Sequence, residues 1–174
     1  NYRTVSDAIK DLEDVKTIYE IKEDLGTKLS VKFEPTPLSA YLRDSNTLYN
    51  HIITRTREVA MKRFKAIAPG ENFHSLNLAL KENTYTDISR TQNTIYQRLR
   101  YDKPSGTVVN VRKSMWIHPT LDRAISVREA ARLQSFPDSF EFIGTKDSQY
   151  QQVGNAVPPL LAKGIAEILL KYLK

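Results

Sequence analysis

The C-terminal stretch of the chain combines a helix start signal with a broad apolar face. Pro158 and Pro159 suit the first turn of a helix, where a missing N–H costs nothing. Behind them, apolar residues recur at helical spacing: Leu160, Leu161, Ile165, Ile168, Leu169 and Tyr172. A single short helix is at best marginally stable in water. The segment therefore needs a partner surface that buries its apolar face.

The rest of the composition fits a folded chain with its own core. Its 174 residues are enough for one domain, or one and a half. A chain of this size buries roughly 70% of the surface that its unfolded form exposes. It contains no cysteine, which excludes a disulfide scaffold, a thiolate zinc site and a cysteine nucleophile in this chain. Cysteine-free composition is consistent with a reducing cytoplasm.

We expect neither a membrane span nor a secretory signal. The longest apolar stretch, from Ile165 to Leu173, is interrupted by Glu167 and Lys171. It is much shorter than the roughly 20 residues that a span requires. The chain starts at Asn1 instead of Met, so we expect that its true beginning was removed or that it lies on a longer polypeptide.

The net charge of +6 is concentrated in residues 90–132, which hold nine basic and three acidic residues. Tyr96, Tyr101 and Trp116 are interleaved with these charges. Basic residues displace counterions from phosphates and aromatic rings stack on bases, so the pattern suits a surface that follows a nucleic-acid backbone. A solvated basic face explains the charge equally well.

Several short helices are predicted from capping and periodicity. Thr4 and Asp7 have capping spacing ahead of a short helix, as do Ser126 and Glu129 ahead of a helix that should end before Pro137. A further short helix is expected to start at Ser39. Between Thr56 and Ile67, one face would carry Val59, Ala60, Phe64 and Ile67, and the other Arg57, Lys62, Arg63 and Lys65.

Residues 94–117 carry a strand-like pattern. Val108, Val109 and Val111 are β-branched, residues 103–106 supply a turn, and residues 115–117 form a second apolar run. We expect a basic two-stranded element here. Residues 72–94 are polar and lack a sustained period, which is typical of a variable loop region.

Self-sufficient catalytic or metal sites are not evident. His51, His74 and His118 lack metal-ligand spacing, and neither Ser105 nor Ser126 lies in a nucleophile elbow. In the loop expected before the last helix, Gly154 and Asn155 permit close backbone approach. The helix start behind this loop would suit a carboxylate or phosphate. An ordinary turn and cap explains the same residues.

Two long strings resemble a known family. The segments ISVREAARLQSFPDSFEF (Ile125 to Phe142) and QQVGNAVPPLLAKGIAEIL (Gln151 to Leu169) closely resemble the ninth and tenth signature blocks of the cytosine-5 DNA methyltransferases. YQRLRYDKPSGTVV (Tyr96 to Val109) resembles the distal part of that family's target recognition domain. The opening YRTVSDAIKDL resembles the segment after the eighth block, so the resemblance covers the whole chain.

The resemblance implies that this chain carries some of the family's functional motifs and lacks others. In this family a cysteine thiolate attacks carbon 6 of a flipped cytosine, a glutamate assists at the ring nitrogen, and methyl passes from S-adenosylmethionine to carbon 5. The glycine-rich cofactor block, the Pro-Cys block and the Glu-Asn-Val block are not found in this sequence. We therefore expect no catalytic residue in this chain and no activity of the chain alone.

The resemblance also assigns candidate binding residues. Arg98 and Thr107 match positions near the flipped nucleotide and its phosphate, where the alternative for Arg98 is an exposed strand arginine. Further candidates for phosphate contact are Arg100, Lys103, Arg112 and Lys113. Asn155, Ala156 and Val157 match the block that lines the S-adenosylmethionine pocket. Arg128 and Glu129 match a scaffold helix, and sequence readout is expected between Phe73 and Ile95.

These considerations predict an α+β chain with two parts. Residues 1–145 would form a small DNA recognition domain of short strands and helices. Residues 146–174 would form a loop and a C-terminal helix that packs on a missing α/β methyltransferase core. The expected partners are double-stranded DNA and a catalytic half, in cis or as a separate subunit. A bacterial restriction-modification enzyme fits this description, as does a non-catalytic DNA-binding module derived from one. A protein-interaction domain without nucleic-acid affinity is the third alternative.

Overall fold

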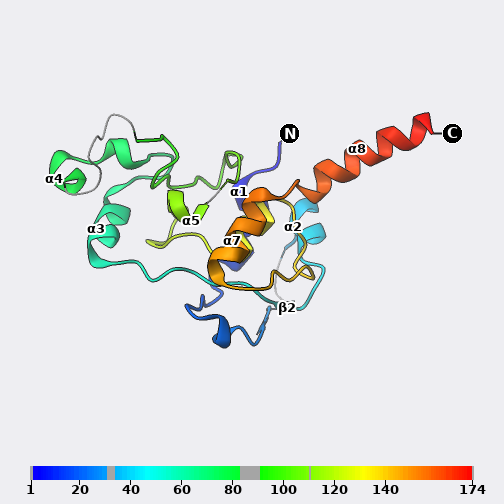
Figure 1. The fold of residues 1–174 in the computed structure, drawn as a ribbon, viewed down its shortest axis with the longest axis horizontal. Coiled ribbons are helices and arrows are strands. Elements are labelled where there is room, and N and C mark those ends of the chain that lie inside the picture. Colours follow the sequence, from blue (N-terminus) through cyan, green and yellow to red (C-terminus); the bar gives the residue numbers. More distant parts are fainter. Residues whose placement is uncertain (1, 31–33, 83–90, 110, 174) are drawn as a thin grey trace.

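The computed structural model describes residues 2–30, 34–82, 91–109 and 111–173. Helices dominate the fold (Figure 1). The α-helices are α1 (Val5–Ile9), α2 (Pro37–Leu42), α3 (Glu58–Ala66), α4 (Leu78–Lys81), α5 (Val111–Ser114), α6 (Val127–Leu133), α7 (Lys146–Asn155) and α8 (Pro159–Tyr172). Single 3-10 turns occur at Lys10–Leu12, Ile21–Glu23 and Phe73–Ser75. Helices with a small strand content agree with the predicted α+β class.

The only sheet in the described part of the chain is small. Strands β1 (Thr27–Lys28) and β2 (Thr47–Leu48) pair antiparallel, with Thr27 opposite Leu48. The two-stranded element predicted for residues 94–117 was wrong. That segment makes an isolated bridge between Arg98 and Ile117 and contains helix α5. Tyr96 and Met115 have positive φ angles of 52° and 50°, which break the regular pleat that a ladder requires.

The predicted capping boxes are confirmed. The Thr4 hydroxyl accepts a hydrogen bond from the Asp7 N–H at 3.3 Å, and the Asp7 carboxylate accepts one from the Thr4 N–H at 2.8 Å. Ser126 and Glu129 make the same exchange at 3.0 and 2.7 Å. Helix α6 ends at Leu133, before Pro137 as expected. These local signals therefore determine where both helices begin.

Two other helix predictions require correction. Helix α2 begins at Pro37 with Thr36 as its cap, before the predicted start at Ser39. In α3, Val59 is 56% exposed although it was expected on the buried face, and Arg63 is buried although it was expected in solvent. Carbonyl groups accept the hydrogen bonds of Arg63, and they make its burial tolerable.

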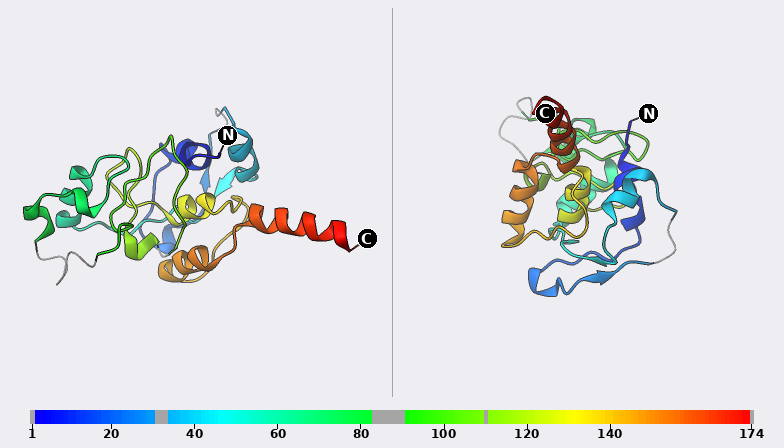
Figure 2. Two further views of the ribbon diagram at one scale, coloured as in Figure 1. Left: turned by 90° about the horizontal axis from the view of Figure 1, so that it is seen from above. Right: turned by 90° about the vertical axis from the view of Figure 1, so that its right-hand side faces the viewer.

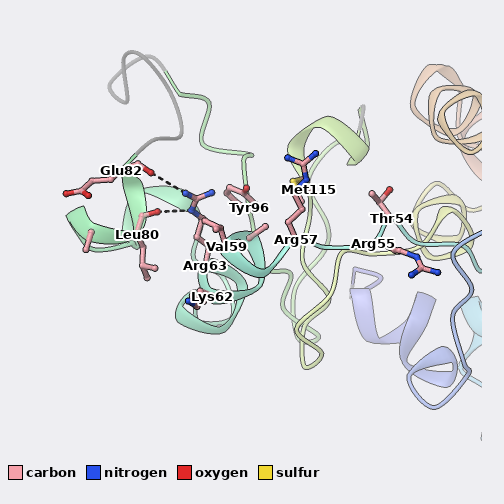
Figure 3. A pocket seen from close by; sticks show the side chains of 12 residues that line it. Thr54, Arg55, Arg57, Val59, Lys62, Arg63, Leu80, Glu82, Tyr96 and Met115 are labelled. Carbon is pink, nitrogen blue, oxygen red and sulfur yellow. Dashed lines mark hydrogen bonds between the residues drawn. The ribbon is translucent and has the colours of Figure 1, made fainter.

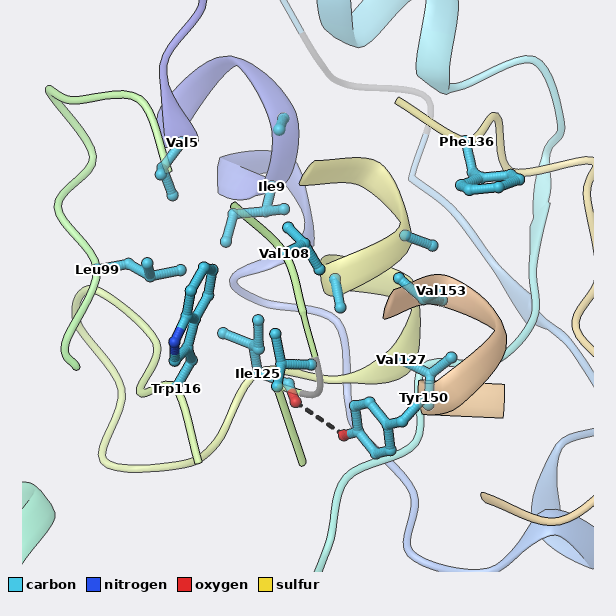
Figure 4. Close-up of a cluster of buried hydrophobic side chains, with 14 of the residues drawn as sticks. Val5, Ile9, Leu99, Val108, Trp116, Ile125, Val127, Phe136, Tyr150 and Val153 are labelled. Carbon is cyan, nitrogen blue, oxygen red and sulfur yellow. Dashed lines mark hydrogen bonds between the residues drawn. The ribbon is translucent and has the colours of Figure 1, made fainter. Parts of the chain in front are cut away.

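The main core lies between α1, α2, α6 and α7 (Figure 4). Trp116 and Ile9 are fully buried there, and Val153 of α7 packs in the same cluster. The Tyr150 hydroxyl donates to the Ile125 carbonyl at 2.9 Å, as Figure 4 shows. Helix α7 also contacts α6 and α5. Helix α7 thus shares one core with the elements that precede residue 145.

A second cluster supports the opposite end of the molecule. Phe64, Phe73 and Tyr96 pack their rings at centroid distances of 5.5 Å (Phe64 to Tyr96) and 5.8 Å (Phe73 to Tyr96). Ile67 and Ile117 are buried beside them. A smaller cluster of Leu12, Leu29 and Leu48 lies under the sheet. The end that carries α3 and α4 therefore has its own apolar support.

Helix α8 projects away from the rest of the molecule (Figures 1 and 2). It begins at Pro159, as predicted, and none of its residues is buried. Leu161, Ile165, Ile168 and Leu169 are 49–56% exposed. The segment before it was predicted as a loop, but residues Lys146–Asn155 form α7 and only Ala156–Pro158 connect the two helices.

By length and composition alone, the run Lys146–Tyr172 is apolar enough to cross a membrane. The connection Ala156–Pro158 divides this run into two helices. The 14 residues of α8 extend about 21 Å, at 1.5 Å per residue, which is shorter than the roughly 30 Å hydrocarbon core. The run does not indicate a membrane protein.

Candidate nucleic-acid interface

Arg98 lies inside the protein, contrary to the exposed position expected from sequence. It is 4% exposed. Its guanidinium donates to the carbonyls of Phe64 and Ile67 at 2.6 and 2.7 Å, and to the Asp122 carboxylate at 2.6 Å. A longer bond of 3.2 Å reaches the His118 carbonyl. The guanidinium thus joins its own segment to the C-terminal end of α3 and to the loop at residues 118–122.

The next candidates form an exposed turn. Arg100, Lys103 and Thr107 are all exposed. Arg100 makes a bidentate pair with Asp102, at 2.9 and 2.6 Å. The N–H of Val5 in α1 donates to the Lys103 carbonyl at 2.9 Å. Helix α1 therefore fixes the backbone of a turn whose side chains face solvent.

Arg112 and Lys113 are exposed on helix α5. The Arg112 Nε lies 2.7 Å from an Asp147 carboxylate oxygen, and the two side chains are 41% and 59% exposed. This ion pair joins α5 to α7. It is open to solvent, so a phosphate can compete with Asp147 for the guanidinium.

Half of the basic residues that the structure describes within residues 90–132 are internal. Arg98, Arg128 and Arg132 are buried, and the Arg123 side chain is 13% exposed. The sequence pattern suggested a phosphate-tracking surface or a solvated basic face, and neither describes these four arginines. They are partnered side chains of the core. Among the described residues of this segment, the exposed cations are Arg100, Lys103, Arg112 and Lys113.

Helix α6 is the centre of this buried charge network. Arg132 makes a bidentate pair with Asp138, at 2.8 and 2.5 Å, and a further bond to Asp11 at 2.6 Å. Arg128 donates to the carbonyls of Tyr49 and Phe140 at 2.9 and 2.7 Å. Buried charges are tolerated when they are paired and hydrogen-bonded in this way. The scaffold role predicted for Arg128 and Glu129 agrees with this geometry.

Glu129 is completely buried and pairs with Arg123. Burial alone would raise the pKa of Glu129, but the hydrogen bonds and charge of Arg123 outweigh it and lower the pKa to about 2. Glu129 is therefore ionised at neutral pH. Its carboxylate acts as a cap and an ion-pair partner, both of which are structural roles.

The histidines are hydrogen-bonded core or surface side chains. His51 bonds to the Val15 carbonyl and the Ser126 hydroxyl, at 3.2 and 2.9 Å. Burial lowers the pKa of His118 to about 4, against the opposing effect of Glu129. No group of three or more potential metal ligands occurs among the described residues.

Asn155, Ala156 and Val157 lie where α7 ends and the connection to α8 begins. Asn155 is exposed, Val157 is 62% exposed, and Ala156 packs partly against the main core. The three residues thus expose a carboxamide and an apolar side chain near the end of α7. They are not enclosed by other described residues, and Asn155 belongs to a helix end instead of the predicted loop.

A family model for the C-5 cytosine-specific DNA methylases matches residues 4–171. The chain belongs to this family. The type II methyltransferase M.XorII of Xanthomonas oryzae pv. oryzae is 34% identical over 193 residues, covering 98% of this chain and 41% of M.XorII. M.BbvI of Brevibacillus brevis is 37% identical over 167 residues, covering 88% of this chain and 43% of M.BbvI.

The fold of this DNA methylase chain also matches a solved structure. An E. coli prophage-encoded protein, described as a DNA modification methyltransferase, aligns with a TM-score of 0.72 at 25% identity. The alignment covers 99% of this chain and 48% of that protein. The chain therefore spans less than half the length of each of these three relatives.

Cytosine-5 DNA methylases use S-adenosylmethionine as methyl donor. In this chain the exposed Asn155 carboxamide can both donate and accept hydrogen bonds, and the exposed Val157 offers an apolar contact. This set of groups fits one wall of a site for a molecule with polar and apolar parts. The remaining walls would have to come from outside the described residues.

Proposed function

We propose that this chain is the DNA-recognition portion of a DNA (cytosine-5)-methyltransferase of a bacterial restriction-modification system, acting in the cytoplasm. The complete enzyme would transfer methyl from S-adenosylmethionine to carbon 5 of a flipped cytosine. One combination of observations carries the proposal: the sequence has no cysteine, and α8 presents an apolar face with no buried residue. The chain thus lacks the nucleophile and offers a surface for a partner that has one.

The exposed basic side chains before residue 145 and the exposed face of α8 support a division of labour within the chain. We assign residues 1–145 to target recognition and residues 146–174 to completion of the cofactor-binding core. Arg100, Lys103, Thr107, Arg112 and Lys113 would contact the DNA backbone. Arg98 would contribute only through the stability of the fold, because its guanidinium joins the segments that support this surface.

These contacts would help to extrude the target base. Extrusion of a base from the duplex costs a few kcal/mol, which backbone contacts must offset. Asn155, Ala156 and Val157 would form one wall of the cofactor site, and S-adenosylmethionine would supply the methyl group there. The catalytic half, in cis or as a separate subunit, would provide the cysteine and the other walls.

The apolar face of α8 supplies the proposed contact with the catalytic half. Exposed apolar patches of this kind commonly mark interaction surfaces. Burial of Leu161, Ile165, Ile168 and Leu169 would stabilise the complex by about 25 cal/mol per Å² of apolar surface removed from water. The connection of three residues to α7 would hold the recognition surface close to that contact.

Complementation tests the proposal. The chain is mixed with a separately expressed catalytic half from a family member, and transfer of labelled methyl to duplex DNA is measured. We expect activity only when both halves are present. A matched variant, Leu161→Asp with Leu169→Asp, should abolish the gain, whereas Ala166→Asp, outside the apolar face, should preserve it.

Two other outcomes lead to different conclusions. Salt-dependent DNA binding without any gain of methyl transfer would favour a non-catalytic DNA-binding module. Absence of salt-dependent DNA binding would contradict both readings and leave a protein-interaction domain.

A further inference from the structure

A groove of about 670 Å³ lies between α3 and α4, at the start of the segment that resembles the family's recognition domain (Figure 3). We call it the α3–α4 groove. Its walls come from residues 54–63 on one side and from α4 on the other, with Tyr96 and Met115 also contributing. A nucleotide is small enough to enter a cavity of this size.

Arg63 builds the groove. Its Nε donates to the Leu80 carbonyl at 2.7 Å and its Nη2 to the Glu82 carbonyl at 3.3 Å, as the dashed lines in Figure 3 mark. Both acceptors lie at the end of α4. The buried guanidinium therefore ties α4 to α3 at a fixed spacing, and the groove is a defined part of the fold.

The rim of the groove is strongly basic. Arg55, Arg57 and Lys62 line the groove, and the Arg55 guanidinium lies 4.8 Å from the centre of the Tyr19 ring. Within the described residues, the Arg57 guanidinium makes no hydrogen bond or ion pair. Lys62 pairs only with the solvent-exposed Glu58, at 3.2 Å. The rim thus has cationic groups available for an anionic ligand.

The interior of the groove is apolar. Val59, Ala60 and Met115 line it. Tyr96 and Met115 both adopt left-handed backbone conformations, which cost free energy and are often found at functional sites. A basic rim around an apolar lining complements a sugar–phosphate backbone. The cations bind the phosphates, and the apolar side chains contact the sugar carbons.

The groove adjoins the surface proposed for DNA contact. Met115 directly follows α5, which carries the exposed Arg112 and Lys113. Figure 3 shows Arg57 extending toward Met115 and α5. The two sets of cations can therefore follow one continuous polyanion across the surface.

We propose that the α3–α4 groove binds the sugar–phosphate backbone of duplex DNA, with Arg57 as its main phosphate contact and Lys62 in support. This inference rests on the proposed function, which makes DNA the ligand of the chain. It adds phosphate contacts, Arg57 and Lys62, that lie outside the basic segment of residues 90–132. It also assigns a function to exposed charges on α3 whose spacing resembles an ordinary solvated helix face.

The test measures the salt dependence of binding to a fluorescein-labelled 30-base-pair duplex of mixed sequence, using the full 174-residue chain. Each lost phosphate contact lowers the slope of log affinity against log salt by about 0.9. We therefore expect Arg57→Ala to reduce the slope by about 0.9 and to weaken binding about 8-fold at 0.1 M salt. The double variant Arg57→Ala with Lys62→Ala should lose about twice that slope.

Lys65→Ala is the matched control, because Lys65 lies on the same helix and is exposed but does not line the groove. It should leave the slope nearly unchanged. An equal loss in Arg57→Ala and Lys65→Ala would overturn the proposal, since only general charge would then matter. Circular dichroism melting should be the same for all variants, because the substituted side chains are exposed.

This measurement separates the inference from the proposed function. Binding is measured without a catalytic half, so failed complementation leaves the effect of Arg57→Ala interpretable. If the chain binds DNA but Arg57→Ala has no effect, the groove proposal fails while DNA recognition through α5 and the Arg100 turn stands. Equal competition by polyglutamate and by unlabelled duplex would indicate an acidic protein partner and would also overturn it.

Discussion

The Arg123 guanidinium donates two hydrogen bonds to the buried Glu129 carboxylate, from Nη1 at 2.8 Å and from Nη2 at 2.6 Å. The same carboxylate accepts the Ser126 N–H at 2.7 Å. The Glu129 side chain therefore caps the start of helix α6 and neutralises the charge of Arg123 in the preceding loop. The helix on which the core is built depends on a charged group within the protein.

Glu129→Gln should strongly destabilise the fold. The substitution keeps the size of the side chain but leaves the Arg123 charge without its buried partner. Removal of one member of a buried pair costs about 3–5 kcal/mol of unfolding free energy, and we expect the lower end because Arg123 is slightly exposed. Urea unfolding measures this loss. Asp102→Asn, at the exposed pair with Arg100, should leave the urea midpoint unchanged, and an unchanged midpoint in Glu129→Gln would refute the assignment.

Stability should fall as the pH drops from about 6.5 to about 4. Burial lowers the pKa of His118 to about 4, and its Nδ1 accepts the N–H groups of Thr120 and Leu121 at 3.3 and 3.2 Å. The unfolded chain therefore binds a proton in this range that the folded chain refuses, so acid favours unfolding. The loss should reach about 3 kcal/mol, at 1.36 kcal/mol per pKa unit.

Urea unfolding at pH 7.5, 5.5 and 4.5 checks this dependence. His118→Gln should reduce the slope between these values, and His51, whose pKa burial also lowers, should retain part of it. Stability should fall further below pH 4.5. The pKa of Glu129 is lowered in the folded state, so the unfolded chain binds a proton there more readily and acid favours unfolding. A wild-type profile that is flat between pH 7.5 and 4.5 would contradict the neutral, buried state of His118.

Arg98→Ala should reduce DNA binding only by unfolding the protein. The substitution removes the Arg98 donor from the buried Ile67 carbonyl and one of two donors from the Phe64 carbonyl, and an unsatisfied buried acceptor costs about 1–3 kcal/mol. We expect a lowered melting temperature, with DNA affinity retained below it. Arg112→Ala should show the opposite result, with weaker binding and unchanged melting. Weaker binding by a fully folded Arg98→Ala would indicate direct contact with DNA.

The isolated chain should self-associate through α8. Leu161, Ile165, Ile168 and Leu169 leave an apolar stripe in water, and its burial between copies is favourable. Light scattering should show a mass that rises with concentration. Ile165→Lys with Leu169→Lys should make the chain monomeric without changing its melting, whereas Ala166→Lys should leave association unaltered. Association that persists in the double variant would place the contact elsewhere.

Local signals in the sequence predicted much of the helical structure. Thr4 with Asp7 and Ser126 with Glu129 carry short-range capping information, and Pro159 starts α8 as expected. The predicted strands in residues 94–117 failed because valines favour extended structure only where a partner strand is available. The positive φ angles at Tyr96 and Met115 depend on packing that no local pattern reveals.

The candidate site was harder to predict than the fold. A count of charges cannot distinguish Arg98, whose partners Phe64 and Asp122 are distant in sequence, from the exposed Arg100. The same limit applied to α3, where Arg63 is buried by the α4 carbonyls that it binds. Burial of a long cationic side chain is decided by long-range acceptors, and sequence spacing does not identify them.

The short connection Ala156–Pro158 fixes the position of the apolar face of α8 relative to the proposed recognition surface. Helix α7 is fixed in the core through Tyr150 and Val153, and the Leu160 N–H donates to the Ser135 hydroxyl at 3.1 Å, which anchors the first turn of α8. One residue inserted after Leu160 would rotate the apolar face of α8 by about 100°. The orientation of the recognition surface relative to a partner bound to α8 therefore depends on the number of residues between α7 and the apolar face of α8. Single-residue insertions and deletions here should be far more disruptive than substitutions.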